Sequence, residues 1–385
     1  MKKKICIITS SFPSYKNDSV SGGVFLRDFA LLLSNENYDV FVLTPSKEGS
    51  KNDDERIKVH FFPWIGSEFG LSALDPKNPM HLLRLVNVVI SGIYSTVKFI
   101  KKNEIELCFA AWAVPSGIFA LVAKIFCKTP YSVWALGSDI WKIQNYPFGK
   151  FVLKSVLKNA QKLFADGLQL VKDVERISNK KCEFLASSRI LDTTARPIAY
   201  EKFNSAKINF MFLGRYHQNK GIDMLIEAIG LLSPEEKEKS LFHIFGLGPL
   251  EEKIKKMVEE LDIKSNTFIN NHLDGNEVFS HMSKSDFVVI PSRIESIPVV
   301  LSDALQCGKP LVVTNVGDMG TLVKQYKVGF VVKPDPVNIA SGLRQAITCD
   351  KKQLALFVSE IDSLKNYLSI KKSAKVFTEY ISRSS

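Results

Sequence analysis

Short apolar runs alternate with helix-like segments along almost the whole chain, and this rhythm constrains the fold more than any other feature. The apolar runs of the first half are residues 5–8, 40–43, 107–111 and 131–135. Those of the second half are residues 208–213, 241–245, 287–290, 311–313 and 330–332. Buried strands separated by helices are typical of parallel sheets covered on both faces. The sequence therefore predicts an α/β protein with two such sheets.

Length and composition limit the classes of protein to consider. A chain of 385 residues is longer than chains that fold around a single hydrophobic core. The Ser/Thr-rich stretch 186–206 is predicted to be a linker between two domains. The six cysteines form no CxxC pair, which favours a reducing compartment. Residues 5–8 are too short for a secretory apolar region, and residues 80–100 contain too many polar side chains for a membrane span. We therefore expect an intracellular protein with two domains.

Ligands of parallel sheets bind at the carboxyl ends of the strands, so the loops there carry the candidate chemistry. Gly22 and Gly23 precede a helix and suit an anion, although a plain flexible loop would read the same way. Arg215 and Lys220 flank a turn and could grip a diphosphate, or could be two solvated cations. Gly246-Leu247-Gly248 follows the next strand and favours a ligand-facing loop, although a GxG by itself is weak evidence.

The most specific pattern lies in residues 291–304. Glu295 follows a strand, and Pro298 suits the first turn of the next helix, whose amides at 297–299 would point outward. Asp303 falls about a turn and a half into that helix and could face a ligand. A nucleoside diphosphate sugar needs such an arrangement, with acceptors for hydroxyls and donors for phosphates. The alternative is one acid at a helix N-terminus and one solvated acid.

This segment resembles the E-x7-E motif of retaining GT-B glycosyltransferases, in particular family GT4. Residues 212–228, 246–249, 304–310 and 316–317 are similar to further segments of that family, in the same order, and Gly22-Gly23 and Gly137-Ser138-Asp139 resemble its N-terminal loops. The resemblance implies a GT-B fold: two Rossmann-like domains whose parallel sheets face each other across a cleft. Residues 1–200 would bind the acceptor and 201–360 the donor, and a helix in 361–385 would pack back on the first domain.

The resemblance also implies roles for single residues. Arg215 and Lys220 would neutralise the departing diphosphate and Glu295 would hold sugar hydroxyls, which makes these three the predicted catalytic residues. Asp303 would bind the ribose. The predicted donor-binding set is Gly22, Gly23, Arg215, Lys220, Gly246, Gly248, Glu295, Ser296, Ile297, Pro298, Val299 and Asp303, and the acceptor-side residues are Ser138 and Asp139.

Two positions depart from the family pattern. Asp303 stands where the family usually has Glu, and Leu136 stands where many relatives have His. We expect retaining, metal-independent transfer from a UDP- or GDP-sugar, with no cofactor, onto a glycan or lipid-linked acceptor in bacterial surface polysaccharide or glycolipid synthesis. The alternatives are a nucleotide-sugar epimerase or hydrolase of the same fold, and a non-catalytic nucleotide-sugar-binding regulator.

The charge distribution suggests a further partner. The net charge is +11 and lies mostly in residues 1–200. Lysines recur every four residues at 150, 154, 158 and 162, which predicts a helix with a basic stripe. Together with Lys2–Lys4 and the aromatic residues Phe61, Phe62, Trp64 and Phe69, this stripe could dock on an anionic membrane, or could be a solvated face. We expect a cytoplasmic protein attached peripherally to the inner face of the plasma membrane, and no nucleic-acid partner.

Overall fold

The computed structural model describes residues 2–15, 23–51, 55–68, 71, 74–75, 78–193, 200 and 202–383. The chain folds into two compact units, Met1–Ser187 with Ile370–Ser385, and Ser188–Ser369. The sequence placed the domain boundaries at 200/201 and 360/361, so the observed division differs at both. Residues 188–191 stay with the second unit because their backbone and side chains bond to one of its helices, and residues 361–367 complete another of its helices.

The first unit is built on a seven-stranded sheet in the order β3-β2-β1-β4-β5-β6-β7, and its strand pairs are parallel. Ile5 of the central strand aligns with Val40 on one side and Leu107 on the other. The strands are β1 Lys3–Thr9, β2 Tyr38–Pro45, β3 Lys58–Phe62, β4 Leu107–Ala111, β5 Tyr131–Ala135, β6 Lys162–Ala165 and β7 Cys182–Phe184.

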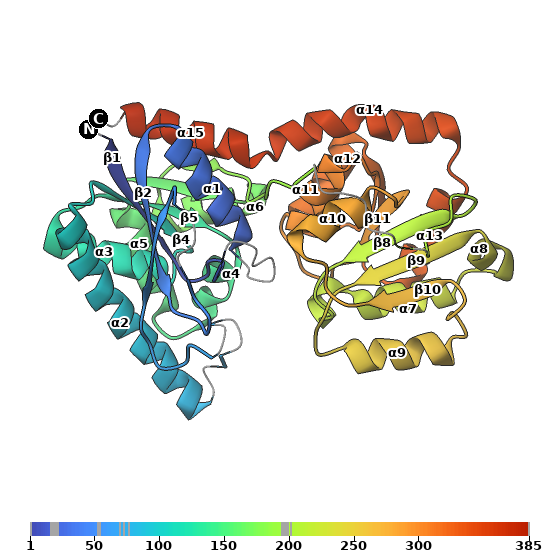
Figure 1. The fold of residues 1–385 in the computed structure, drawn as a ribbon, viewed down its shortest axis with the longest axis horizontal. Helices are drawn as coiled ribbons and strands as arrows, with labels where there is room; N and C mark the ends of the chain where they lie inside the picture. Colours follow the sequence, from blue (N-terminus) through green and yellow to red (C-terminus); the bar gives the residue numbers. More distant parts are fainter. Residues whose placement is uncertain are drawn as a thin grey trace. The chain divides into compact units, whose positions relative to one another are not determined.

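Helices cover both faces of this sheet (Figure 1). One face carries α2 (Pro79–Asn103), α3 (Ser116–Cys127), α5 (Gly149–Asn159) and α6 (Leu168–Ser178). The other carries α1 (Val24–Asn35) and the last helix, α15 (Ile370–Arg383). Phe377 of α15 packs against Phe109 and Phe29, with ring centroids 4.3 and 5.6 Å away. The short helices α4 (Ser138–Trp141) and η2 (Ile143–Asn145) follow β5.

The second unit contains a six-stranded parallel sheet in the order β10-β9-β8-β11-β12-β13. Apolar residues are paired side by side in neighbouring strands, and Phe210 is the partner of Phe242. The strands are β8 Ile208–Leu213, β9 Ser240–Phe245, β10 Thr267–Asn270, β11 Phe287–Ile290, β12 Leu311–Thr314 and β13 Gly329–Val332.

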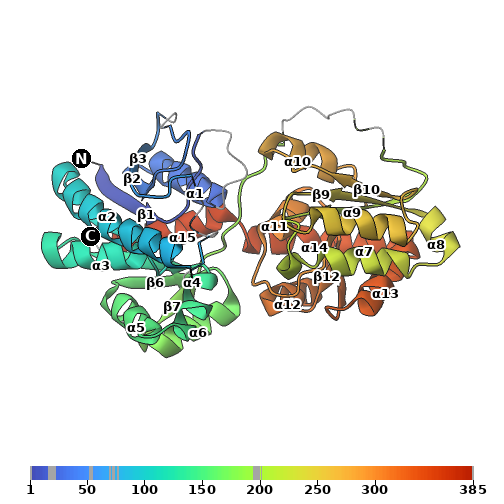
Figure 2. The same cartoon turned by 90° about the horizontal axis from the view of Figure 1, so that it is seen from below.

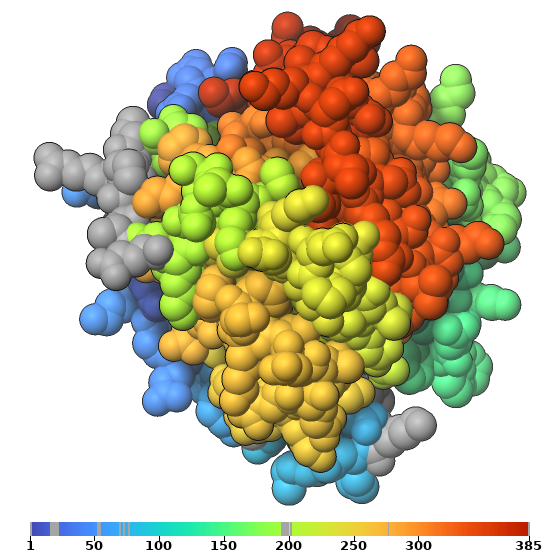
Figure 3. Space-filling view, turned by 90° about the vertical axis from the view of Figure 1, so that its right-hand side faces the viewer, coloured from blue at the N-terminus to red at the C-terminus, as the bar shows by residue number. Residues whose placement is uncertain are grey.

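Helices also cover both faces of the second sheet. One face carries α7 (Ile222–Gly230) and α9 (Glu251–Glu260), which lie side by side in Figure 2, and α13 (Pro336–Ile347). The other helices are η3 (Gln218–Lys220), α8 (Pro234–Glu238), α10 (Gly275–Met282), α11 (Val299–Gln306), α12 (Gly317–Tyr326) and α14 (Lys351–Tyr367). Figure 3 shows the end of this unit, with α8 in yellow, α9 in gold below it and the red C-terminal helices of the unit above it.

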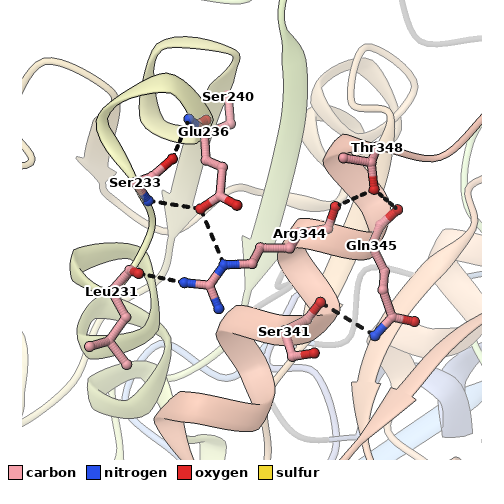
Figure 4. Close-up of polar contacts among 8 residues, drawn as sticks. All are labelled: Leu231, Ser233, Glu236, Ser240, Ser341, Arg344, Gln345 and Thr348. Carbon is pink, nitrogen blue, oxygen red and sulfur yellow. Dashed lines mark hydrogen bonds and ion pairs between the residues drawn. The ribbon is translucent and has the colours of Figure 1, made fainter.

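A polar network fastens two of these helices at the amino ends of the strands (Figure 4). Ser233 caps α8 in a capping box, in which its hydroxyl accepts from Glu236 N and the Glu236 carboxylate accepts from Ser233 N. The Arg344 side chain of α13 donates to Glu236 Oε2 at 3.2 Å and to the carbonyl of Leu231 at 2.6 Å. This network joins α13 to the turn between α7 and α8.

The outer face of the first unit differs from the sequence-based expectation. Phe62 and Trp64, expected to face a membrane, are buried in the core. Phe69 lies outside the described residues. Lys162 begins β6 and pairs with Glu183, so it does not continue the lysine stripe of α5. Phe62 is the last residue of β3 and Lys162 is the first residue of β6. The pairing of these strands in the sheet therefore fixes where both side chains lie.

Helix α2 is apolar and long, and by length and composition it could cross a membrane, contrary to the expectation from its polar residues. One side of α2 packs against the core of the first unit. Gly92 of α2 lies against Phe119 of α3 so closely that an added Cβ atom would be 2.4 Å from the ring. Val88, Thr96 and Ile100 are buried on the same side of α2.

Candidate functional site

The predicted donor-site residues gather at one edge of the second sheet. Strand β8 lies between β9 and β11, and the loops after these strands carry Arg215, Gly246 and Glu295. Since the carboxyl ends of parallel strands meet at the same edge, the three loops are neighbours. The N-terminus of α12 joins them, because β12 ends at the same edge.

The loops after β8 and β9 touch through their backbones. A Cβ atom added to Gly246 would lie 2.0 Å from the carbonyl oxygen of Gly214. A Cβ atom added to Gly248 would lie 2.6 Å from the carbonyl oxygen of Tyr216. Tyr216 N donates to Leu247 O at 2.9 Å, which continues the strand pairing into the loops. Both glycines are therefore needed for loop packing, whatever further role they have toward a ligand. Arg215, which stands between Gly214 and Tyr216 in the loop after β8, has an exposed side chain.

Tyr216 is a structural centre that the sequence did not single out. Its ring is fully buried, and its hydroxyl lies 2.6 Å from Asn270 O and 3.2 Å from Ile244 O. Burial raises the pKa of this phenol, so the hydroxyl stays a hydrogen-bond donor. Tyr216 thereby holds the ends of β8, β9 and β10 together beneath Arg215.

The Glu295 loop is held from both sides by close backbone contacts. Gly221, with φ of +67°, lies so near the loop that a Cβ atom would be 1.9 Å from Pro291 O. Gly317, with φ of +52°, approaches Glu295 O in the same way, at 2.0 Å. Arg293 N donates to Asn219 O at 2.8 Å. Only glycine satisfies such a conformation and such a distance together, so the loop position is fixed by its neighbours.

These contacts bring Lys220 and Glu295 together. The Lys220 ammonium forms an ion pair with the Glu295 carboxylate, and the two side chains are 34% and 18% exposed. The adjoining Ser296 hydroxyl is buried and has no hydrogen-bond partner among the described residues. The site thus offers a partly exposed cation, a carboxylate and an unused hydroxyl within one loop cluster.

A second ion pair supports the Glu295 loop from below. Arg293 Nη1 and Nη2 lie 2.6 and 2.9 Å from the two carboxylate oxygens of Asp223, in the first turn of α7. Burial would raise the pKa of Asp223, but the hydrogen bond and charge of Arg293 outweigh it and hold that pKa below its usual value. Asp223 and Arg293 lie inside the segments that resemble the GT4 family, yet their sequence positions indicated no role.

Helix α11 begins one residue later than predicted. Pro298 has extended backbone angles, φ −73° and ψ 145°, and is the N-cap, so the helix starts at Val299. Because the backbone of Pro298 is extended, this proline is the last residue of the loop that contains Ile297 and does not enter the helix. No side chain of the described residues caps α11, which leaves its first amides pointing out of the helix toward the loop.

Asp303 is engaged by a residue that the sequence did not predict. Arg189 donates through Nε and Nη2 to the two Asp303 carboxylate oxygens, at 2.9 and 2.6 Å. The Asp303 side chain is only 1% exposed. Gln306, one turn later, accepts from Leu191 N and donates to Arg189 O, so the segment 189–191 lies fastened along α11. No local pattern around Arg189 could have revealed this pair, because its partner is 114 residues away.

The predicted residues of the first unit are mainly structural in their contacts. Gly22 lies outside the described residues, and Gly23 is the N-cap of α1, where a Cβ atom would lie 2.3 Å from Ser11 O. Asp139 is buried, and its carboxylate accepts from Ala113 N at 2.5 Å and Leu136 N at 3.0 Å. Burial raises the pKa of Asp139 to about 6. Ser138 is exposed beside it.

The search for a metal site gives a result for part of the chain only. Within the ranges that the structure describes, no group of three His, Cys, Asp or Glu side chains is arranged to hold a metal ion. Asp53 and Asp54 lie outside these ranges.

The sequence matches two family models, one in each unit. Residues 198–375 match "Glycosyl transferases group 1", and residues 19–167 match "Glycosyl transferase 4-like". Among curated relatives, an uncharacterised glycosyltransferase of Methanocaldococcus jannaschii is 27% identical over 82% of both chains. The Bacillus subtilis glycosyltransferase TuaC, named for teichuronic acid biosynthesis, is 24% identical over 66% of this chain and 64% of its own.

Solved structures show the same fold. Sucrose-phosphate synthase from Thermosynechococcus elongatus superposes with a TM-score of 0.79 over 100% of both chains, at 15% identity. HepE of Anabaena, solved with UDP and glucose, gives 0.74 over 99% of this chain and 100% of its own, also at 15% identity. The family matches span most of the sequence, and their order agrees with the two parallel-sheet units. The chain therefore belongs to the glycosyltransferases of the GT4 type, with the GT-B fold.

Proposed function

We propose that this glycosyltransferase moves a sugar from a nucleoside diphosphate donor with retention of the anomeric configuration, and that Arg215, Lys220 and Glu295 carry the reaction. The observation that supports this most is the pairing of Lys220 with Glu295 at the carboxyl ends of the strands, below the exposed Arg215. Cations at that edge suit a diphosphate, and a carboxylate beside them suits sugar hydroxyls.

In the proposed reaction, the bond between the anomeric carbon and the diphosphate oxygen breaks while the acceptor oxygen attacks the same face. The acceptor proton passes to the departing phosphate oxygen. Arg215 and Lys220 stabilise the charge that develops on the diphosphate, and Glu295 positions the sugar. The two cations supply charge stabilisation, so we propose that no metal ion is required.

We propose a UDP- or GDP-linked sugar as the donor. A solved structure of HepE holds UDP and glucose, so uridine nucleotides are the first donors to test, followed by GDP-sugars. The comparisons give no support to an epimerase, a hydrolase or a non-catalytic regulator.

The test is a thermal-shift series with UDP- and GDP-sugars on the unchanged protein and on Arg215→Ala. Arg344→Ala is the matched control, because it removes an arginine from the opposite edge of the same sheet. We expect a shift with one nucleotide class that disappears in Arg215→Ala and persists in Arg344→Ala. Product NMR then reads the anomeric configuration, and transfer after EDTA treatment tests metal dependence. Inversion, or loss of transfer with EDTA, would contradict the corresponding part of the proposal.

We further propose that the acceptor is lipid-linked and that the first unit docks on anionic lipid. Helices α2, α3 and α5 cover the same face of the sheet, and their outer sides carry large exposed apolar residues. These are Leu83, Ile90 and Tyr94 on α2, Ile125 and Phe126 on α3, and Phe148 and Phe151 at the start of α5. Exposed lysines lie among them at 98, 101, 102, 150 and 154. Apolar side chains bordered by cations suit an anionic membrane surface and a cytoplasmic, peripheral enzyme.

Vesicle sedimentation tests this docking. The protein should co-sediment with vesicles that contain anionic lipid at low salt, and it should not co-sediment with neutral vesicles. The double substitution Phe148→Ser/Phe151→Ser should reduce the affinity for anionic vesicles about tenfold or more. Leu356→Ser is the matched control, because it removes an exposed apolar residue from α14 of the other unit. Equal sedimentation of the double variant and the unchanged protein would argue against this surface.

A further inference from the structure

We propose that Asp303 serves the donor site through Arg189, so that the Arg189 guanidinium rather than the Asp303 carboxylate meets the ribose of the nucleotide. The inference rests on the proposed function, because it concerns the nucleotide of that same donor. It assigns a role to a residue of the segment before β8 that no sequence motif includes.

The geometry of the pair carries the inference. Two parallel N–H donors of Arg189 meet both oxygens of Asp303, at 2.9 and 2.6 Å, which is the bidentate arrangement of a strong pair. The Asp303 side chain is 1% exposed and that of Arg189 is 12% exposed. A ligand that approaches this part of α11 therefore reaches the arginine before it reaches the carboxylate.

The pair should persist when the nucleotide binds. A ribose that took Asp303 for itself would have to strip a buried guanidinium of its counter-charge, and removal of one partner from a buried pair is among the most costly local changes in proteins. Hydrogen bonds from the ribose hydroxyls to the carboxylate would at most offset that cost, whereas hydrogen bonds to the guanidinium leave the pair intact. The shorter side chain of aspartate favours the same outcome, since Asp303 holds the arginine close against α11.

The surroundings of Arg189 also fit a ligand site. Gln306 donates to the Arg189 carbonyl oxygen at 2.9 Å and so bonds only the backbone of this segment, whereas Asp303 holds the guanidinium itself. His272, in the loop after β10, lies near enough that the Arg189 charge, added to burial, lowers the pKa of the imidazole. Its Nε2 atom is buried and has no partner among the described residues. A polar atom left unpaired beside a fixed cation is a feature that a bound ligand would complete.

The exchange changes the chemistry of recognition. A free carboxylate accepts hydrogen bonds from a ribose diol, whereas a guanidinium donates them to ribose oxygen atoms. The site should therefore still distinguish a ribonucleotide from its deoxy analogue, but this preference should depend on Arg189. Asp303 becomes a positioning residue that orients the fork of Arg189.

The experiment measures binding of UDP and of 2′-deoxy-UDP to the full chain by calorimetry, with GDP in parallel. Arg189→Gln removes the cation, and Arg189→Lys keeps a charge beside Asp303 but lacks the planar fork. The matched control is Gln306→Ala, which loosens the same segment from the same helix without touching the ion pair. Melting temperatures are recorded for each variant.

We expect Arg189→Gln to weaken UDP binding about 10- to 100-fold, the effect of losing a hydrogen bond to a charged group. We also expect it to reduce the preference for UDP over 2′-deoxy-UDP, while Arg189→Lys falls between and Gln306→Ala changes affinity by less than about threefold. Tighter UDP binding in either Arg189 variant would overturn the inference, because it would mean that a released Asp303 binds the diol. Unchanged affinity with a lower melting temperature would also overturn it, as would an equal loss in Gln306→Ala. If the unchanged protein binds neither UDP nor GDP, the proposed function fails, and this inference fails with it.

Discussion

Removal of Arg293 should destabilise the second unit more than removal of Asp223, although both changes break the same ion pair. The Asp223 side chain is 8% exposed and that of Arg293 is 30% exposed. Arg293→Ala leaves a nearly buried carboxylate without its counter-charge, which we expect to cost about 3–4 kcal/mol in the free energy of unfolding. Asp223→Ala leaves an arginine that can reach water, so we expect about 1.5–2.5 kcal/mol. The difference corresponds to several degrees in melting temperature for a unit of this size.

The pH dependence gives a second test of the same reasoning. In the unchanged protein the pKa of Asp223 is held below its usual value, so the ion pair stabilises the fold above about pH 4 and this contribution is lost as the pH falls through the lowered pKa. In Arg293→Ala the effect of burial is opposed only by the backbone amides of Asp223 and Met224, so the pKa of Asp223 rises and protonation relieves the buried charge. The penalty of Arg293→Ala should therefore shrink between pH 7 and pH 4, where the unchanged protein keeps its pair.

The distribution of tryptophan makes the assay specific for one unit. All four tryptophans, at positions 64, 112, 134 and 141, lie in the first unit. In urea unfolding, circular dichroism reports both units, whereas tryptophan fluorescence reports the first. We expect both substitutions to shift the dichroism transition only. Arg344→Ala is the control, because its partner Glu236 is 25% exposed and the loss should be about 1 kcal/mol or less. An equal or larger cost for Asp223→Ala, or a penalty of Arg293→Ala that does not change with pH, would refute the argument from burial.

Three further substitutions test the framework of the site. Gly221→Ala should lower the free energy of unfolding by about 2–4 kcal/mol in chemical denaturation and weaken nucleotide binding. Gly308→Ala, at φ +66° with no atom within 4 Å of an added Cβ, should cost only about 1 kcal/mol. Similar costs for the two variants would show that the contact with Pro291 is unimportant. Tyr216→Phe should cost about 1–2 kcal/mol by removing the donor to two carbonyl oxygens, and a neutral effect in thermal unfolding would contradict this. Asp139 has a pKa raised to about 6, so its contribution to stability is fully present below about pH 4 and is lost as the pH rises to about 6. Asp139→Asn should remove this slope from tryptophan-detected unfolding, and an unchanged slope would argue against it.

The sequence predicted the parts of the fold that local chemistry controls. Apolar runs located most strands of both sheets, and the glycine and cation pattern located the loops after β8, β9 and β11, because strand periodicity and turn chemistry act over a few residues. The strands β3, β6, β7 and β10 were not predicted. Contacts between distant segments were not predictable in this way. The pairing of Arg189 with Asp303 spans 114 residues, and the burial of Phe62 depends on where β3 enters the sheet. The boundary at Ser187/Ser188 moved for the same reason, since side chains of α11 hold the segment that follows it.

The motifs of the second unit place glycines at fixed positions, and the structure offers a physical reason. Its loops are fitted backbone to backbone, with Gly246 against Gly214 and with Gly221 and Gly317 against the two ends of the Glu295 loop. At these distances no side chain is tolerated, so the loop positions dictate glycine at fixed places in the sequence. In the first unit, by contrast, Asp139 fixes its loop with a buried side chain that accepts backbone amides, a task that other polar residues can also perform. Loops fitted by close backbone contacts therefore leave a readable glycine motif in the sequence, whereas a loop fixed by one buried polar side chain does not.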